Sequence, residues 1–170
     1  MNIQWYPGHM AKTKRLLGDK LKLINVAVIV VDARAPLSTF NPDLKSILAE
    51  KACMIVLNKC DLADETQTKL WVEYYKKEYG SALAFSATQF KKGVLMSAIN
   101  NAAAPIIKRY KDKGMNKTIR VLVSGIPNVG KSAIINRLVG RKGAKEGNKP
   151  GVTRGLQWAR LSDKLELLDS

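Results

Sequence analysis

Residues 125–132 form a glycine-rich segment, Gly-Ile-Pro-Asn-Val-Gly-Lys-Ser, with the spacing of a phosphate-binding loop. Its glycines let successive backbone N–H groups curl around phosphate oxygens, and a helix that begins directly afterwards adds the positive end of its dipole. The amine of Lys131 can reach the β- and γ-phosphates, and the hydroxyl of Ser132 can hold Mg²⁺. A glycine-rich turn between a strand and a helix is the alternative. The nucleotide-binding residues expected here are Asn128, Val129, Gly130, Lys131, Ser132 and Ala133.

A second polar segment, Asn-Lys-Cys-Asp at residues 58–61, has the pattern of a guanine reader. The carboxylate of Asp61 can accept hydrogen bonds from N1 and N2 of guanine together, whereas adenine would leave it unpaired, and a buried unpaired polar group rejects an analogue strongly. Ser86 and Ala87 follow a further predicted strand. They are expected to support Asp61 and to offer a backbone N–H to guanine O6. On its own, the 58–61 segment is equally consistent with a solvated turn.

Two more residues have side chains suited to Mg²⁺. Thr153 lies in Pro-Gly-Val-Thr-Arg-Gly (150–155), within a polar stretch at 141–155 that reads as a long mobile loop. Its hydroxyl can join Mg²⁺ and touch the γ-phosphate, which would make the loop sensitive to the nucleotide. Asp169 ends a predicted strand, where its carboxylate can organise Mg²⁺ through water. A threonine in a turn and an aspartate at a strand end are the alternatives.

The order of these segments is informative. The guanine reader comes before the phosphate-binding loop, whereas an ordinary GTPase has them the other way round. Each segment follows a predicted strand, which is the context that a nucleotide site requires. Together they predict a guanine nucleotide site on a circularly permuted chain.

The elements that position these residues alternate between strands and helices, which predicts an α/β fold. The pattern is that of a P-loop GTPase, with a mostly parallel six-stranded sheet, helices on both faces and a final hairpin that adds an antiparallel edge. Strands are predicted at residues 25–32, 53–57, 82–85, 119–124, 156–161 and 165–168. Helices are predicted at residues 10–24 (basic and amphipathic), from a cap at Asp64 and Gln67 to Gly80, at 93–110 with a break or kink at Pro105, and at 132–139.

The composition sets limits on the kind of protein. A chain of 170 residues fits one domain, and its net charge of +15 predicts a polyanionic partner, either nucleic acid or an anionic membrane. The basic residues gather at 12–22, 108–120 and 137–154, which favours contact with RNA phosphates over a merely solvated surface. No apolar run reaches the length of a membrane span and the N-terminus has no signal-peptide pattern, so we expect a cytoplasmic protein. We also expect it to be a monomer. Cys53 and Cys60 are expected to be reduced thiols.

Beyond these motifs, residues 5–10 (Trp-Tyr-Pro-Gly-His-Met) and 32–36 (Asp-Ala-Arg-Ala-Pro) complete a set that resembles the YlqF/RbgA family of circularly permuted bacterial ribosome-assembly GTPases. The resemblance covers essentially the whole chain. It implies GTP hydrolysis coupled to maturation of the large (50S) ribosomal subunit, with GTP or GDP and Mg²⁺ as ligands and rRNA as partner. Asn58, Lys59 and Asp61 would read guanine with Ser86 and Ala87 in support. Thr153 would be the switch I threonine, and Asp169 would start the DxPG motif.

The same resemblance raises expectations about the chain beyond Ser170. The sequence stops before the Pro-Gly of DxPG and before the helical RNA-binding C-terminal domain of the family, so residues 1–170 correspond to the GTPase domain alone. We expect the native chain to continue.

Two catalytic hypotheses rest on single residues. His9 can orient or deprotonate the attacking water, or it can simply pack against or cap the helix that begins near Met10. Asn128 resembles the asparagine of potassium-activated GTPases, where it helps to hold K⁺ beside the phosphates, and the alternative is a loop-stabilising role.

Two other functions are consistent with parts of the pattern. An RNA-binding assembly module could use guanine nucleotide only as a conformational ligand, without turnover. An ATP-using P-loop enzyme is disfavoured, because Asp61 suits guanine and not adenine.

Overall fold

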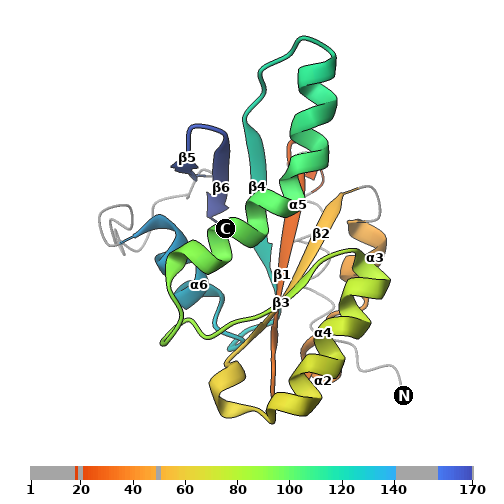
Figure 1. Cartoon of the computed structure of the whole chain (residues 1–170), viewed down its shortest axis with the longest axis vertical. Coiled ribbons are helices and arrows are strands. Elements are labelled where there is room, and N and C mark those ends of the chain that lie inside the picture. The colour runs from red at the N-terminus through yellow and green to blue at the C-terminus, as the bar shows by residue number, and fades with distance from the viewer. Residues whose placement is uncertain (1–17, 19–20, 49–50, 141–156, 170) are drawn as a thin grey trace.

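The computed structural model describes residues 18, 21–48, 51–140 and 157–169, and its centre is one six-stranded sheet (Figure 1). The strand order is β3-β2-β1-β4-β6-β5. Only the pair β5–β6 is antiparallel, so the predicted parallel sheet with an antiparallel edge is confirmed. The strands are β1 (Val26–Asp32), β2 (Ala52–Asn58), β3 (Ala82–Ala84), β4 (Ile119–Ser124), β5 (Gln157–Ser162) and β6 (Leu165–Asp169).

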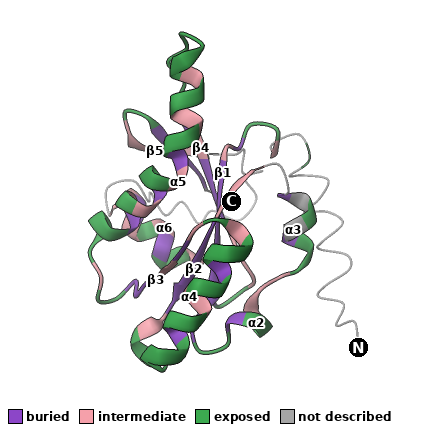
Figure 2. Cartoon of the chain, turned by 45° about the vertical axis from the view of Figure 1, so that its right-hand side comes forward, coloured by how far each residue is buried: buried purple, intermediate pink, exposed green. Residues whose placement is uncertain are grey.

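The sheet is buried on both faces because its central strands are apolar throughout. All seven residues of β1 are buried, as expected for a parallel strand that is covered on both sides. Side chains alternate along it, so Val26, Val28 and Val30 face one core cluster, while Ala27, Ile29 and Val31 face the other. Figure 2 shows these buried strands beneath helices with exposed outer surfaces.

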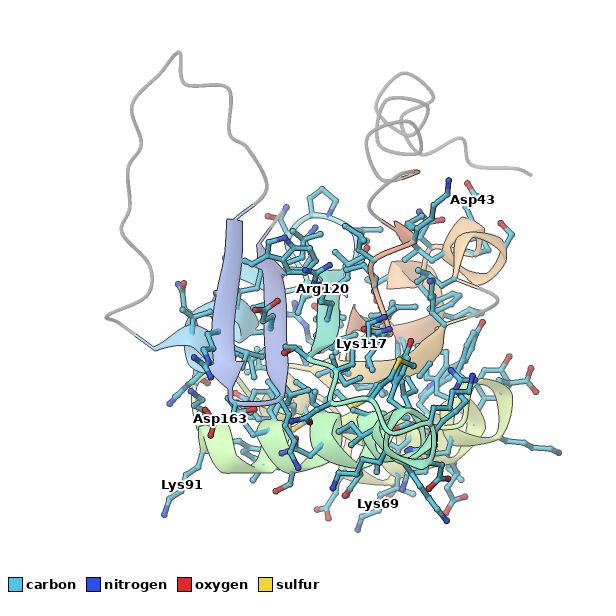
Figure 3. The ribbon with its side chains drawn as sticks, turned by 90° about the horizontal axis from the view of Figure 1, so that it is seen from above. Asp43, Lys69, Lys91, Lys117, Arg120 and Asp163 are labelled. Atoms are coloured by element: carbon cyan, nitrogen blue, oxygen red, sulfur yellow. The ribbon has the colours of Figure 1, made fainter. Side chains whose placement is uncertain are left out.

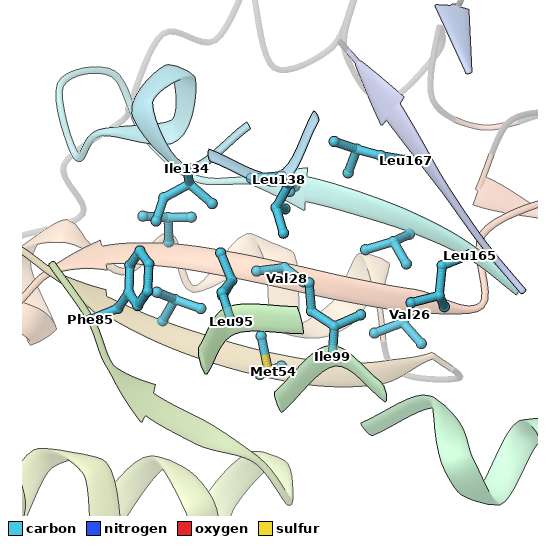
Figure 4. Close-up of a cluster of buried hydrophobic side chains, with 14 of the residues drawn as sticks. Val26, Val28, Met54, Phe85, Leu95, Ile99, Ile134, Leu138, Leu165 and Leu167 are labelled. Atoms are coloured by element: carbon cyan, nitrogen blue, oxygen red, sulfur yellow. The ribbon is translucent and has the colours of Figure 1, made fainter. Parts of the chain in front are cut away.

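Different helices cover the two faces. Leu95 and Ile99 of α5 (Lys92–Asp112) and Ile134 of α6 (Lys131–Val139) pack on one face (Figure 4). Tyr75 of α4 (Glu65–Tyr79) and Leu44 of α3 (Asp43–Ile47) pack on the other. The prediction of helices on both faces is therefore confirmed.

The boundaries of α4 confirm the capping prediction. The carboxylate of Asp64 accepts a hydrogen bond of 2.8 Å from the backbone N–H of Gln67, and the helix ends at Gly80 with φ of 86°. Three short elements were not predicted, namely α2 (Pro36–Thr39), α3 (Asp43–Ile47) and the 3₁₀ turn η1 (Cys60–Leu62).

Of the break or kink predicted at Pro105, the break is wrong, because α5 remains one helix through this residue. The ribbon of α5 does change direction along its length, which is compatible with a kink (Figure 1). The predicted helix at 10–24 lies mostly outside the described residues. Among the residues of this range that the structure describes, Gly18 and Leu21 are helical.

Candidate functional site

The sheet topology places the functional segments at one edge. The chain leaves β1 toward β2 and β3 on one side, whereas β4 pairs with β1 on the other side. This reversal is a topological switch point, and ligands of open α/β sheets bind beyond the carboxyl ends of the strands there. The phosphate-loop sequence follows β4 and the guanine-reader sequence follows β2, so both begin at this edge.

The phosphate loop follows a path that requires glycine at two positions. Gly130 has φ of 95°, and a Cβ there would overlap the Nδ2 atom of Asn58. A Cβ on Gly125 would lie 2.5 Å from the backbone oxygen of Val30. Asn128 also has a left-handed backbone, with φ of 70°. The close approach of this loop to β1 and β2 therefore depends on the missing side chains.

The first turn of α6 carries the remaining residues of the loop. The Lys131 amine donates a hydrogen bond of 2.5 Å to the Gly125 carbonyl, and partial burial lowers its pKa. A desolvated amine gains more than a solvated one from an approaching anion. Ser132 and Ala133 are exposed at the start of the helix, where a ligand can reach them.

The guanine reader and the phosphate loop touch directly. The buried side chain of Asn58 donates from Nδ2 to the Val129 carbonyl at 3.0 Å and accepts at Oδ1 from the Ala87 N–H at 3.2 Å. Lys59, with φ of 62°, donates from Nζ to the Asn128 carbonyl at 2.7 Å. The bonds from Asn58 to Val129 and from Lys59 to Asn128 join residues about seventy positions apart in the chain. Asp61 is exposed within η1.

Asp32 is a further member of this site that the sequence reasoning missed. It ends β1 with its carboxylate almost fully buried, and its Oδ2 lies 3.3 Å from the Lys59 amine. The Arg34 guanidinium donates to Oδ1 at 3.0 Å and to Oδ2 at 2.7 Å. Mainly through these bonds, the pKa of Asp32 falls from 3.8 to about 2. The signal was an aspartate at the end of a wholly apolar strand.

The loop after β3 is organised differently from the expectation. Ser86 is fully buried, and its hydroxyl lies 3.1 Å from the Thr88 hydroxyl and accepts from the Gln89 N–H at 3.3 Å, rather than supporting Asp61. The Ala87 N–H is engaged by Asn58. The guanidinium of Arg137, on α6, donates to the carbonyls of both Ala87 and Thr88. From the sequence alone, Arg137 is only one of the basic residues at 137–154.

The structure does not describe the side chains of three predicted site residues. His9 and Thr153 lie outside the described residues. Asp169 closes β6 opposite Gln157 of β5, and its side chain is outside the described part. Their expected roles remain predictions.

The loop after β4 requires glycine and is hydrogen-bonded to an Asn-Lys-x-Asp segment that comes earlier in the chain. This arrangement defines a circularly permuted P-loop GTPase fold. A family profile described as "50S ribosome-binding GTPase" matches residues 120–170. Ribosome biogenesis GTPase A of Bacillus cereus is 44% identical, and the match covers 100% of this chain and 58% of that protein. The corresponding protein of Priestia megaterium is 45% identical over 100% of this chain and 60% of its own length.

A solved structure gives the same assignment. The crystal structure of GNP-bound YlqF from Thermotoga maritima aligns with a TM-score of 0.68 and 33% identity, covering 94% of this chain and 57% of that chain. The chain belongs to the Ribosome biogenesis GTPase A (YlqF/RbgA) family, which confirms the resemblance drawn from its motifs. It spans about three fifths of the length of the relatives that it matches.

Proposed function

We propose that this chain binds GTP and hydrolyses it to GDP and phosphate. The observation that carries the proposal is a pair of hydrogen bonds made by Asn58. They join the Val129 carbonyl of the phosphate loop to the Ala87 N–H of the loop after β3 (residues 86–89), called the base loop below. One amide side chain thus fixes the spacing between the phosphate-binding and base-binding parts. Preorganised donors of this kind lose little entropy when a nucleotide arrives.

Each residue of the site has a distinct role in the proposed reaction. The amine of Lys131 neutralises the β- and γ-phosphates, and the N–H groups of the phosphate loop surround their oxygens. The carboxylate of Asp61 pairs with guanine. Mg²⁺ would be held by Ser132 and Thr153, with Asp169 acting through water, and would supply charge neutralisation on the phosphates. Asn128, which is exposed on the loop, would hold K⁺.

The test is nucleotide selectivity of Asp61→Asn. The wild-type chain should prefer GTP over ATP, and the variant should lose that preference because an amide cannot accept from N1 and N2 together. Xanthosine triphosphate should bind the variant better than GTP does, since the amide can donate to the xanthine O2. Asp163→Asn, at an exposed turn, is the matched control and should keep the wild-type order. Unchanged selectivity in Asp61→Asn would remove the guanine assignment.

We further propose that the protein assists assembly of the large ribosomal subunit in the cytoplasm, acting as a monomer that binds rRNA in precursor particles. The names of its relatives support the ribosomal role. Its charge of +15 supports a polyanionic partner. No helix among the described residues is long and apolar enough to cross a bilayer, which is compatible with this role.

The RNA contact is expected at the end of α5 and the loop into β4, on the edge of the sheet opposite the phosphate loop. Arg109, Lys111 and Lys113 are exposed there. Lys117 lies over the Tyr110 ring, 4.7 Å from its centroid, and Arg120 lies over the Trp158 ring at the same distance. Lys117 and Arg120 are labelled in Figure 3. Such stacking holds the cations in place, which lowers the entropy lost when phosphates bind.

Two charge reversals of equal size test whether binding depends on this particular surface or only on the net charge of the protein. Arg109 and Lys111 occupy the last turn of α5, and Lys76 and Lys77 occupy the last turn of α4. Changing the first pair to Glu should weaken binding to 50S precursors. It should also reduce the slope of log K against log[salt], where K is the binding constant, by about one for each lost phosphate contact. Changing the second pair should do less, although the net charge falls equally. Equal losses would contradict the proposed surface.

A further inference from the structure

Arg137 is a half-buried basic residue whose guanidinium donates hydrogen bonds to backbone carbonyls of the protein. It lies near the end of α6, the helix that begins with Lys131. Its Nε donates to the Ala87 carbonyl at 2.6 Å, and its Nη2 donates to the Thr88 carbonyl at 3.1 Å. A planar guanidinium can make both charge-assisted bonds at once, which an ammonium group cannot match in geometry. Arg137 therefore differs from the solvated cations with which its sequence position groups it.

These two bonds fix the orientation of successive peptide planes in the base loop. The peptide bond is planar and trans, so the direction of the Ala87 carbonyl determines the opposite direction of the Thr88 N–H. In the same way, the Thr88 carbonyl determines the direction of the Gln89 N–H, which meets the Ser86 hydroxyl at 3.3 Å. Ala87 is held on both sides, since its own N–H donates to Asn58.

The loop needs this support because of its position. It follows β3, a strand of only three residues at the edge of the sheet. Thr88 and Gln89 are exposed, whereas Phe85 and Ala87 share a core cluster with Ile134 of α6. The apolar contacts set how close α6 lies, and Arg137 sets which way the loop peptides point.

We propose that Arg137 is a positioning residue for guanine recognition: by holding the Ala87 carbonyl, it aligns the Thr88 N–H for the O6 atom of the base, from the helix that follows the phosphate loop. The proposal rests on the proposed function, because it assumes a guanine nucleotide in this site. It makes base selectivity depend on a residue that touches no nucleotide.

The test compares two ligands that differ at one atom. GDP and 6-thio-GDP share N1, N2 and the phosphates, but sulfur is a much weaker acceptor than the carbonyl oxygen. Arg137→Lys keeps the positive charge and loses the planar guanidinium that donates to two carbonyls at once. It should raise the Kd of GDP roughly tenfold, the loss expected for one hydrogen bond between a backbone N–H and a carbonyl oxygen, and that of 6-thio-GDP less than about twofold. Arg137→Gln should give the same pattern. Arg160→Lys, on β5, should change neither value.

The outcomes separate the two proposals. A purely structural role for Arg137 would weaken both nucleotides by the same factor, and that result overturns the assignment, as does an unchanged affinity for GDP. The ratio of the two Kd values is compared within one variant, so a lower stability of that variant does not produce the expected pattern. A wild-type chain that fails to prefer GDP over ADP overturns the proposed function, and the positioning role with it.

Discussion

The buried carboxylate of Asp32 should make a measurable, pH-dependent contribution to stability. It receives two hydrogen bonds from the Arg34 guanidinium and one from the Arg34 backbone N–H, and it faces the Lys59 amine. These partners, with Arg34 the strongest, outweigh the opposing effect of burial and lower its pKa from 3.8 to about 2. The charged form is therefore favoured in the folded state relative to the unfolded chain.

The size and sign of the contribution come from that difference. The gap between 3.8 and about 2, at 1.36 kcal/mol per pKa unit, corresponds to about 2 kcal/mol. Because the folded pKa is the lower one, this stabilisation is present above about pH 4 and is lost as the pH falls through the folded value near 2. About half of it should remain at pH 3.

Urea unfolding of the wild type and Asp32→Asn at pH 7, 4 and 3 measures this directly. The variant should be less stable by about 2 kcal/mol at pH 7, and the gap should shrink to roughly half of that at pH 3. Asp163→Asn is the control, because this carboxylate is 97% exposed in its pair with Arg160 and should contribute no more than about 0.5 kcal/mol. A gap that stays constant from pH 7 to pH 3 would refute the reasoning.

Three further predictions concern the nucleotide site. Gly130→Ala should destabilise the chain by at least about 2 kcal/mol in urea unfolding and weaken nucleotide binding, because the left-handed backbone is strained and the new methyl group displaces Asn58. Stability within about 0.5 kcal/mol of the wild type would contradict this. Hydrolysis should be faster in K⁺ than in Na⁺ if Asn128 helps to hold a cation, and equal rates would exclude that role. His9→Ala should slow single-turnover hydrolysis, whereas an unchanged rate with intact stimulation by ribosomal particles would rule out a catalytic His9.

The elements that could be predicted from the sequence are those with strong local signals. Apolar runs bounded by turn residues located the strands to within one residue, and Asp64 and Gly80 marked both ends of α4. Pro105 shows where local signals fail. Proline costs a helix about 3 kcal/mol through a lost hydrogen bond and a clash. Here the turns before and after it bury Ala103 and partly bury Ile106 and Tyr110, and this packing keeps α5 continuous.

The site shows a similar division. Motif spacing predicted that residues 125–132 and 58–61 contribute to one site, and the structure brings these two segments into contact. The contact of Asp32 with Lys59 and the contacts of Arg137 with Ala87 and Thr88 could not be read in this way, since these partners lie elsewhere in the chain. The Arg34 partner of Asp32 is local, only two residues away. Ser86 is a different case, because its hydroxyl contacts only the neighbouring residues Thr88 and Gln89 among the hydrogen bonds of the described residues.

The permuted order is compatible with the site because the contacts that assemble it do not depend on chain order. Asn58 and Lys59 reach the carbonyls of Val129 and Asn128 across the sheet, and Arg137 reaches back to Ala87. The covalent connection between the two halves runs through α5 into β4, at the opposite edge of the sheet. The pairing of β1 with β4 therefore sets the distance between base loop and phosphate loop, and these side-chain bonds set their orientation. A nucleotide that contacts both halves would stabilise the same arrangement, because it binds only when they are joined.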